Sequence, residues 1–136
     1  MIALILWFLN TGAGVDVHLT ISNVQQTTGQ ILIAVYDQED AFLQVGKMRA
    51  HRILPVYQTG SLDVTIPQLP VGSYAISCFH DLNGNGKLDT NLVGIPTEPY
   101  GFSNNARPKF RAPTWNETKI LVTPTSQHIA IQLNKW

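Results

Sequence analysis

The segment Leu69–His80, read as LPVGSYAISCFH, decides the fold class of this chain. From its tyrosine onward the residues alternate, so that Tyr74, Ile76 and Cys78 share one face and the residues between them share the other. A period of two residues predicts a β-strand, because successive side chains of a strand point to opposite faces. The proline and glycine before Tyr74 predict a tight turn that leads into this strand.

Similar short runs recur along the chain, separated by turn residues roughly every 8–12 positions. They predict six further strands, at residues 17–22, 29–36, 52–57, 62–66, 119–123 and 128–133. The run at 29–36 is apolar on both faces, which favours a central strand, whereas 128–133 is half polar, which favours an edge strand. Many short strands with almost no helix predict an all-β chain folded as a single Greek-key β-sandwich.

Two details refine this prediction. A tyrosine that enters a strand just after a turn can donate its hydroxyl to upstream backbone, as in the tyrosine corner of immunoglobulin-like domains. Tyr74 suits that role, and a plain core tyrosine is the alternative. Residues 37–49 interrupt the strand pattern and predict a short helical turn, with Phe42, Leu43 and Val45 tucked inward.

The composition suits one globular domain and limits its partners. The chain has 136 residues, and nine basic and nine acidic residues cancel to a net charge of zero. A neutral chain is a poor candidate for non-specific nucleic-acid binding, which requires a basic surface. The single cysteine, Cys78, cannot form a disulfide within the chain, and its place in the alternating run predicts a buried, inert thiol.

The N-terminus, MIALILWFLNTGAGVDV, has the pattern of a secretory signal peptide. An apolar run at residues 2–9 is followed by small residues suited to cleavage, and it is too short to span a bilayer. No Lys or Arg precedes the run, and a hydrophobic N-terminal strand is the alternative. We therefore expect a signal peptide at 1–14, a β-sandwich domain at 15–136, and a periplasmic or secreted location.

Residues 80–105, HDLNGNGKLDTNLVGIPTEPYGFSNN, form a long Gly/Asn/Pro-rich loop whose first half resembles a calcium loop. Calcium takes six to eight oxygen ligands, and the twelve-residue loop supplies them from positions 1, 3, 5, 7, 9 and 12, with glycine at 6. On that template the ligands are Asp81, Asn83, Asn85, the Lys87 carbonyl and Asp89, with Gly86 at the turn. Glu98 is expected to fold back and supply a further carboxylate.

The loop also departs from the template. Position 12 is Leu92 instead of a bidentate glutamate, and Asn83 and Asn85 are neutral. Weak binding, on the order of 10⁻⁴–10⁻³ M as in extracellular modules, is therefore the expectation for calcium. The alternative is a metal-free loop, because Asp and Asn side chains satisfy their own turn backbone and glycine permits positive φ.

The second half of the loop offers candidate ligand-binding residues. Tyr100 and Phe102 are aromatic, and Asn104 and Asn105 add amide donors and acceptors. This combination suits contact with a glycan or a peptide, since rings supply an apolar surface and amides fix orientation. The alternative is that Tyr100 and Phe102 plug one end of the sandwich.

A short basic pattern follows the aromatic residues. Arg107, Lys109 and Arg111 alternate, so on an extended segment they would share one face and Phe110 would point to the core. Such a stripe can receive an anionic ligand or lipid headgroup, or it can be a solvated strand edge that discourages aggregation.

Catalysis has little support in the sequence. His80 and Asp81 are adjacent, so their side chains would leave a strand on opposite faces and could not form a His–Asp relay. The other histidines are scattered, and no GxSxG or HExxH motif occurs. A glycosidase-type carboxylate pair, Asp81 with Glu98 or Asp89, is conceivable. We therefore expect a non-catalytic binding or structural module rather than a hydrolase.

From Leu69 onward the chain resembles a bacterial family called domain of unknown function 2141. The resemblance rests on Gly72-x-Tyr74-Ala75, on HDxNxNGKLD at 80–89, and on GIPxEPYGFSNN at 94–105, and residues 29–37 resemble its early strand. It implies an exported protein of Gram-negative periplasmic type with an immunoglobulin-like or transthyretin-like sandwich. It implies no activity.

Overall fold

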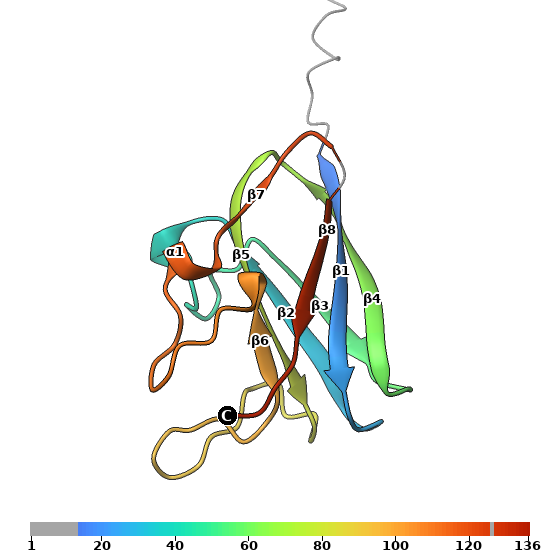
Figure 1. The fold of residues 1–136 in the computed structure, drawn as a ribbon, viewed down its shortest axis with the longest axis vertical. Coiled ribbons are helices and arrows are strands. Elements are labelled where there is room, and N and C mark those ends of the chain that lie inside the picture. Colours follow the sequence, from blue (N-terminus) through green and yellow to red (C-terminus); the bar gives the residue numbers. More distant parts are fainter. Residues whose placement is uncertain (1–13, 126) are drawn as a thin grey trace, which may run out of the picture.

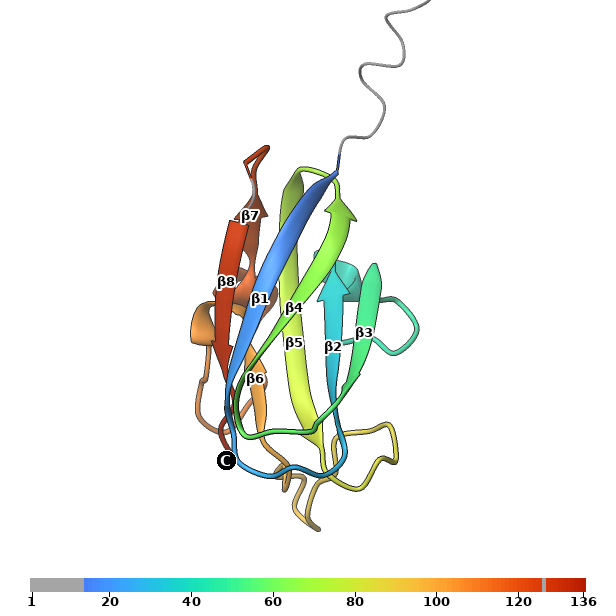
Figure 2. The same ribbon diagram turned by 90° about the vertical axis from the view of Figure 1, so that its right-hand side faces the viewer.

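The computed structural model describes residues 14–125 and 127–136, which form two β-sheets packed face to face (Figures 1 and 2). The strands are β1 (Val15–Val24), β2 (Gln30–Tyr36), β3 (Ala50–Pro55), β4 (Gly60–Leu69), β5 (Gly72–Asp81), β6 (Tyr100–Phe102), β7 (Ile120–Val122) and β8 (Gln127–Gln132). The prediction of an all-β sandwich is confirmed. Apart from Gly14, the expected signal peptide at 1–14 lies outside the described residues.

One sheet has the order β4-β1-β8, and the other has the order β3-β2-β5-β6, with β7 also paired to β5. β1 runs antiparallel to β4 but parallel to β8, so that His18 lies beside His128. β6 and β7 pair with successive parts of β5, at residues 77–79 and 72–74. The central position expected for 29–36 and the edge position expected for 128–133 are both confirmed.

The short helical elements lie between strands. In residues 14–125 and 127–136 they are two 3₁₀ turns, η2 (Glu39–Ala41) and η3 (Ser103–Asn105), and a single helical turn, α1 (Trp115–Thr118). Within the described part of the chain, no helix is long and apolar enough to cross a membrane.

The core lies between the two sheets and follows the period-2 patterns of the sequence. Every second residue of β1, β2 and β5 points inward, and these side chains are almost fully buried. The largest apolar side chains of the core, including those from β4 and from residues 131–133, are Leu19, Ile21, Ile31, Ile33, Ile66, Leu69, Ile76, Ile131 and Leu133. Full burial of one such side chain stabilises the fold by about 1.5–3 kcal/mol, so the inner faces set the register of the sheets.

The tyrosine corner is present. The Tyr74 hydroxyl donates to the Pro70 carbonyl at 2.6 Å, and the ring is buried in the core. This bond fixes the turn before β5. Four residues on, Cys78 is buried in the same core, and its burial raises the pKa of the thiol to about 12.

The segment between β2 and β3 corrects one prediction. The helical turn begins where expected, and Phe42 packs edge-on against Tyr36 and Trp115 at ring-centre distances of 5.5 and 6.3 Å. Val45, however, is fully exposed and Leu43 is 36% exposed, so neither is tucked inward. Leu43 has a φ of 60°, which turns the chain away from the core directly after Phe42.

Candidate functional site

Asp81 ends β5 and organises the first turn of the long loop. Its carboxylate is fully buried and accepts hydrogen bonds from the backbone N–H of Asn85 at 3.2 Å and of Gly86 at 2.8 Å. The Gln30 side chain of the neighbouring strand β2 donates a third bond at 3.0 Å. Gly86 has a φ of 83°, a conformation that suits glycine. The residue expected at ligand position 1 is therefore held firmly against the sheet.

Asn83, Asn85 and Asp89 form the centre of the loop. The side-chain oxygen of Asn83 accepts from the Asn85 backbone at 3.2 Å, and that of Asn85 accepts from the Lys87 backbone at 3.1 Å. Both amide nitrogens then donate to the Asp89 carboxylate, each at 2.7 Å. The structure thus brings together the three residues that the sequence placed at positions 3, 5 and 9, while the Lys87 side chain is exposed.

Glu98 folds back over this loop, as the sequence predicted. It is only 3% exposed, and its two oxygens accept from the backbone N–H of Leu82 at 2.7 Å and of Asp89 at 2.9 Å. The side chain therefore latches the two ends of the loop, residues 82 and 89, to one carboxylate. This role as a latch was not part of the sequence prediction, which treated Glu98 as a metal ligand.

The charges of the loop are unusual. Asp81, Asp89 and Glu98 bring three carboxylates into one loop, and all the hydrogen bonds described above come from neutral N–H groups. Among residues 14–125 and 127–136 the ion pairs are Arg49–Asp37 and Arg111–Glu117, so none neutralises these carboxylates. In that same part of the chain, no group of three or more His, Cys, Asp or Glu side chains is arranged to hold a metal ion. As it stands, the loop is bonded to itself.

Tyr100 and Phe102 lie on β6 and point away from the core. Their strand partners on the same face of the sheet are Phe79 and Ser77, and the two rings meet edge-on at 6.0 Å. Gly101 between them faces inward, where a Cβ atom would lie 2.7 Å from both the Gln132 carbonyl oxygen and the Ile131 side chain. A glycine is needed there because β6 packs directly against β8.

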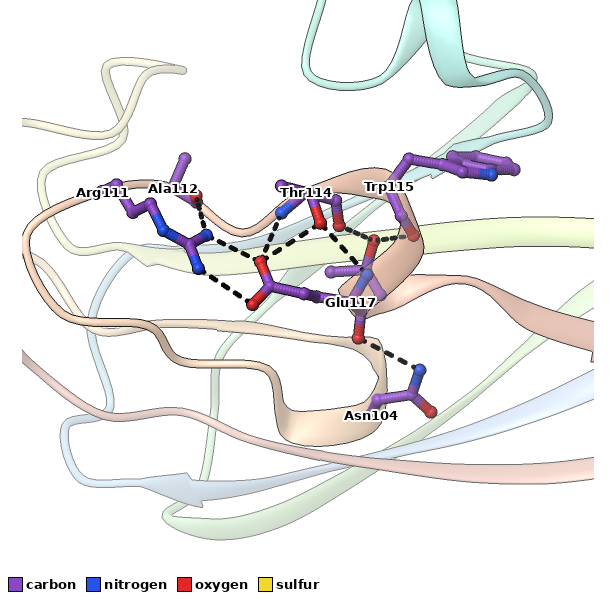
Figure 3. Close-up of polar contacts among 7 residues, drawn as sticks. Asn104, Arg111, Ala112, Thr114, Trp115 and Glu117 are labelled. Atoms are coloured by element: carbon purple, nitrogen blue, oxygen red, sulfur yellow. Dashed lines mark hydrogen bonds and ion pairs between the residues drawn. The ribbon is translucent and has the colours of Figure 1, made fainter.

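Asn104 and Asn105 do not join these aromatic residues. The Asn104 amide donates to the carbonyls of Glu117 and Lys119 at 3.3 and 3.0 Å, and the first of these bonds is drawn in Figure 3. The Asn105 side-chain oxygen accepts from the Gln132 backbone at 3.0 Å. Both residues have positive φ, at 62° and 49°. Their amides bind η3 to α1 and β8, so the four candidate ligand residues do not share one surface.

The basic stripe expected at 107–111 is not formed. Residues 107–113 contain no strand, and Phe110 has a φ of 64° and is 85% exposed instead of facing the core. Arg107 stacks over the Tyr100 ring at 4.0 Å and donates to the Tyr100 carbonyl at 2.9 Å. A stripe requires an extended segment, and the left-handed residue at 110 breaks that geometry.

Arg111 and Glu117 form a separate polar cluster at α1 (Figure 3). The Arg111 guanidinium binds both oxygens of the Glu117 carboxylate, at 2.7 and 3.1 Å. Glu117 also accepts from the Thr114 backbone at 2.9 Å, and Thr114 caps the helix in return. The Arg111 bonds, followed by the Thr114 backbone bond, lower the pKa of Glu117 to about 2. This cluster holds the single turn of helix in place.

Sequence reasoning missed an apolar groove over the outer face of the β3-β2-β5-β6 sheet. It consists of two cavities, of about 610 and 480 Å³, that share Leu43, Leu88, Tyr100 and Phe102. Strand pairing aligns the floor in two rows across the sheet, Ile53–Leu32–Phe79–Tyr100 and His51–Ala34–Ser77–Phe102. The sequence feature that could have indicated the groove is that residues 29–36 are apolar on the outer face of their strand as well as on the inner face.

Two loops form the walls of this groove. One is the turn after η2, where Met48 is 40% exposed beside Leu43. The other is the middle of the long loop, where Leu88, Val93 and Ile95 line the groove. The hydrogen bonds of Glu98 to the backbone of residues 82 and 89 hold the loop segment that carries Leu88. The carboxylate-rich centre of the loop therefore helps to position one wall of the groove.

The histidines lie in different places. His80 is buried and its ring bonds to the Thr28 carbonyl at 2.7 Å. His18 and His128 lie on the outer face of the other sheet, beside Thr65 and Thr20 respectively. His51 lies on the groove floor. These positions do not test the hydrolase hypothesis, which stays a prediction.

The sequence profile of one family, described as an uncharacterized protein conserved in bacteria (DUF2141), matches residues 19–130. This chain belongs to DUF2141. The match confirms the resemblance seen in the loop and spans β1 to β8, although the family description assigns no activity. No curated protein and no solved structure matches the chain, so the finer immunoglobulin-like or transthyretin-like assignment of this DUF2141 protein stays a prediction.

Proposed function

We propose that this protein is a non-catalytic binding module that is exported to the periplasm or secreted, and that its binding surface is the apolar groove. The observation that carries the proposal is the contiguous apolar hollow over the β3-β2-β5-β6 sheet. Export is supported by the hydrophobic N-terminal run followed by small residues. Membership of a bacterial family agrees with this location.

The exposed apolar side chains support binding because they leave a large surface uncovered. Around the groove, Ile53 is 51%, Phe110 is 85% and Trp136 is 47% exposed. Contiguous apolar patches on a water-soluble domain mark interaction sites, since covering them removes apolar area from water. Two loops that rise on both sides of the floor make the surface concave, as expected of a ligand site.

The groove favours an apolar ligand over the glycan expected from the sequence. A glycan needs donors and acceptors for its hydroxyls, and the amides of Asn104 and Asn105 are bonded to backbone elsewhere. An extended peptide would likewise leave backbone N–H and C=O groups without partners over a floor of Leu32, Phe79 and Tyr100. A peptide is therefore the second candidate partner.

Binding of an apolar dye tests the proposal. We expect the neutral dye Nile red to bind the domain and the Leu43→Asp variant to weaken that binding at least tenfold, because Leu43 lines both cavities. Asp accepts the left-handed conformation of this position more readily than Leu, so the variant should fold. Leu121→Asp is the matched control, since Leu121 is 61% exposed and lies outside the groove. Failure to bind, or equal loss in both variants, refutes the proposal.

Calcium binding at residues 81–98 is the second part of the proposal. It is supported by three carboxylates without a basic partner in the described chain and by the loop-template spacing of Asp81, Asn83 and Asn85. Binding would require the two amides to turn, so that their oxygens face Asp89 instead of their nitrogens. The metal-free loop is the competing candidate, and the existing amide–carboxylate bonds favour it.

Thermal unfolding in calcium and in chelator distinguishes the two candidates. If calcium binds, an excess of about 100 times its dissociation constant stabilises the fold by about 2.7 kcal/mol, which raises the midpoint by several degrees. Asp89→Asn should abolish that shift, because it removes the central carboxylate. Absence of any shift at 10 mM calcium, which is about tenfold above the weak end of the expected range, rejects the metal and leaves the self-bonded loop.

A further inference from the structure

The groove is lined by charges of one sign. Its charged residues are Arg52 and Lys87 in one cavity and Arg107 and Arg111 in the other, and neither lining contains an Asp or Glu. The chain as a whole is neutral, so this is a local asymmetry rather than a consequence of composition. An apolar floor with a purely basic rim is complementary to a ligand that is apolar along its length and anionic at one end.

The four cations differ in how free they are to meet such a ligand. Arg111 is held by the Glu117 carboxylate, and Arg52 belongs to the inner-facing register of β3 and donates to the Thr65 carbonyl at 2.8 Å. Arg107 already donates to the backbone carbonyls of Tyr100 and Asn134.

Lys87 is different, because its side chain is exposed and makes no ion pair within the described part of the chain. It stands on the long-loop wall, above the floor row of Leu32 and Phe79. Its flexible amine is thus the cation best placed to meet an anionic end group.

We propose that the groove binds a free long-chain fatty acid, with the acyl chain along the floor and the carboxylate beside Lys87. An acyl chain has no donors or acceptors along its length, so it leaves no polar group unsatisfied on Leu32, Phe79 and Tyr100. Arg107, which stacks over the Tyr100 ring, adds a positive charge to the second cavity of the groove. This inference rests on the proposed function, since it names the ligand class of the same groove.

Competition with Nile red tests the inference, with sodium laurate, sodium octanoate and 1-dodecanol as competitors in chelator-containing buffer. Laurate should compete two- to fivefold better than 1-dodecanol, which is the size of one solvent-exposed ion pair. Laurate should also compete far better than octanoate, because each added methylene that is fully buried improves binding by roughly fourfold. Lys87→Gln should bring laurate to the level of 1-dodecanol. Lys119→Gln, an exposed lysine outside the groove, is the control and should not differ from the unmodified protein.

The outcomes separate this inference from the proposed function. If the dye binds but laurate and 1-dodecanol compete equally, or Lys87→Gln has no effect, the fatty-acid inference is wrong and the apolar groove remains a binding site. If phosphatidylglycerol vesicles or an acidic apolar peptide compete and laurate does not, the inference is also wrong, and the ligand is a membrane surface or a peptide. If the dye itself does not bind, the proposed function fails first.

Discussion

Replacement of Glu98 by glutamine tests the latch that holds the long loop. The buried carboxylate accepts two backbone N–H groups, from Leu82 and Asp89, at 2.7 and 2.9 Å. Glutamine has one oxygen to accept with and places an NH₂ group against the second N–H. One hydrogen bond to a charged acceptor, worth about 1.5–3 kcal/mol, is lost, and a buried donor is left without a partner at about 1–3 kcal/mol.

These two effects overlap, because both include the loss of the same N–H acceptor. We therefore expect Glu98→Gln to lower the free energy of unfolding by roughly 2–4 kcal/mol, which for about 120 residues lowers the melting midpoint by on the order of 10 °C. Urea unfolding followed by fluorescence gives the free energy, and calorimetry gives the midpoint. Glu39→Gln is the matched control, because Glu39 is exposed and should change stability by less than about 0.5 kcal/mol.

If Glu98→Gln lowers the free energy of unfolding by less than about 1 kcal/mol, Glu98 does not act as a latch, since its two hydrogen bonds would then stabilise the fold no more than exposed hydrogen bonds do. Repeating the unfolding of Glu98→Gln in calcium adds a second result. If Glu98 is also a calcium ligand, the variant loses any calcium-dependent stabilisation as well as its basal stability. If its role is only that of a latch, the calcium-dependent shift survives in the destabilised variant.

Three further predictions concern the framework. Tyr74→Phe removes the buried hydroxyl bond and should cost about 1–2 kcal/mol of unfolding free energy, whereas Tyr57→Phe, at an 82% exposed position, should cost almost nothing. The carboxyl of Glu117 should titrate near pH 2 by NMR and return toward its ordinary pKa in Arg111→Gln; because its folded pKa is lowered, its contribution to stability is present above about pH 4.5 and is lost as pH falls toward 2. Cys78, with a pKa raised to about 12 by burial, should not react with a thiol reagent at pH 8 until the protein unfolds, and rapid native-state labelling would contradict this.

Local patterns were the part of the structure that the sequence predicted well. The strand at 72–81 was evident because its inner face alternates with small residues, and the Asx-type bonds of Asn83 and Asn85 were foreseen in the metal-free alternative, because their partners lie two residues away. The strand β6 was not expected, since three residues centred on Gly101 carry no readable periodicity. Position 101 requires glycine because β8, which lies about 30 residues further along the chain, leaves no room for a Cβ atom there.

Sequence patterns could not predict which side chains form hydrogen bonds to backbone groups far away in the chain. The aromatic and amide residues of the candidate ligand set looked alike in sequence, but Asn105 bonds to Gln132, 27 positions away, while Phe102 lies over the groove. Phe110 was placed in the core on the assumption of an extended chain, and its left-handed backbone reverses that placement. The groove itself arises where two separate loops meet over one sheet, and neither loop alone shows it.

The parallel pairing of β1 with β8 has a consequence for how the chain acquires its structure. The two strands are joined by contacts such as that between Thr20 and His128, which are 108 positions apart. Pairing two strands that are so far apart in the chain loses loop-closure entropy before the contacts between them stabilise the fold. We therefore expect slow folding for a chain of this size. Until residues 127–132 arrive, β1 has one open edge. A chain threaded through a translocation channel from its N-terminus would therefore complete its core only after almost its whole length had crossed.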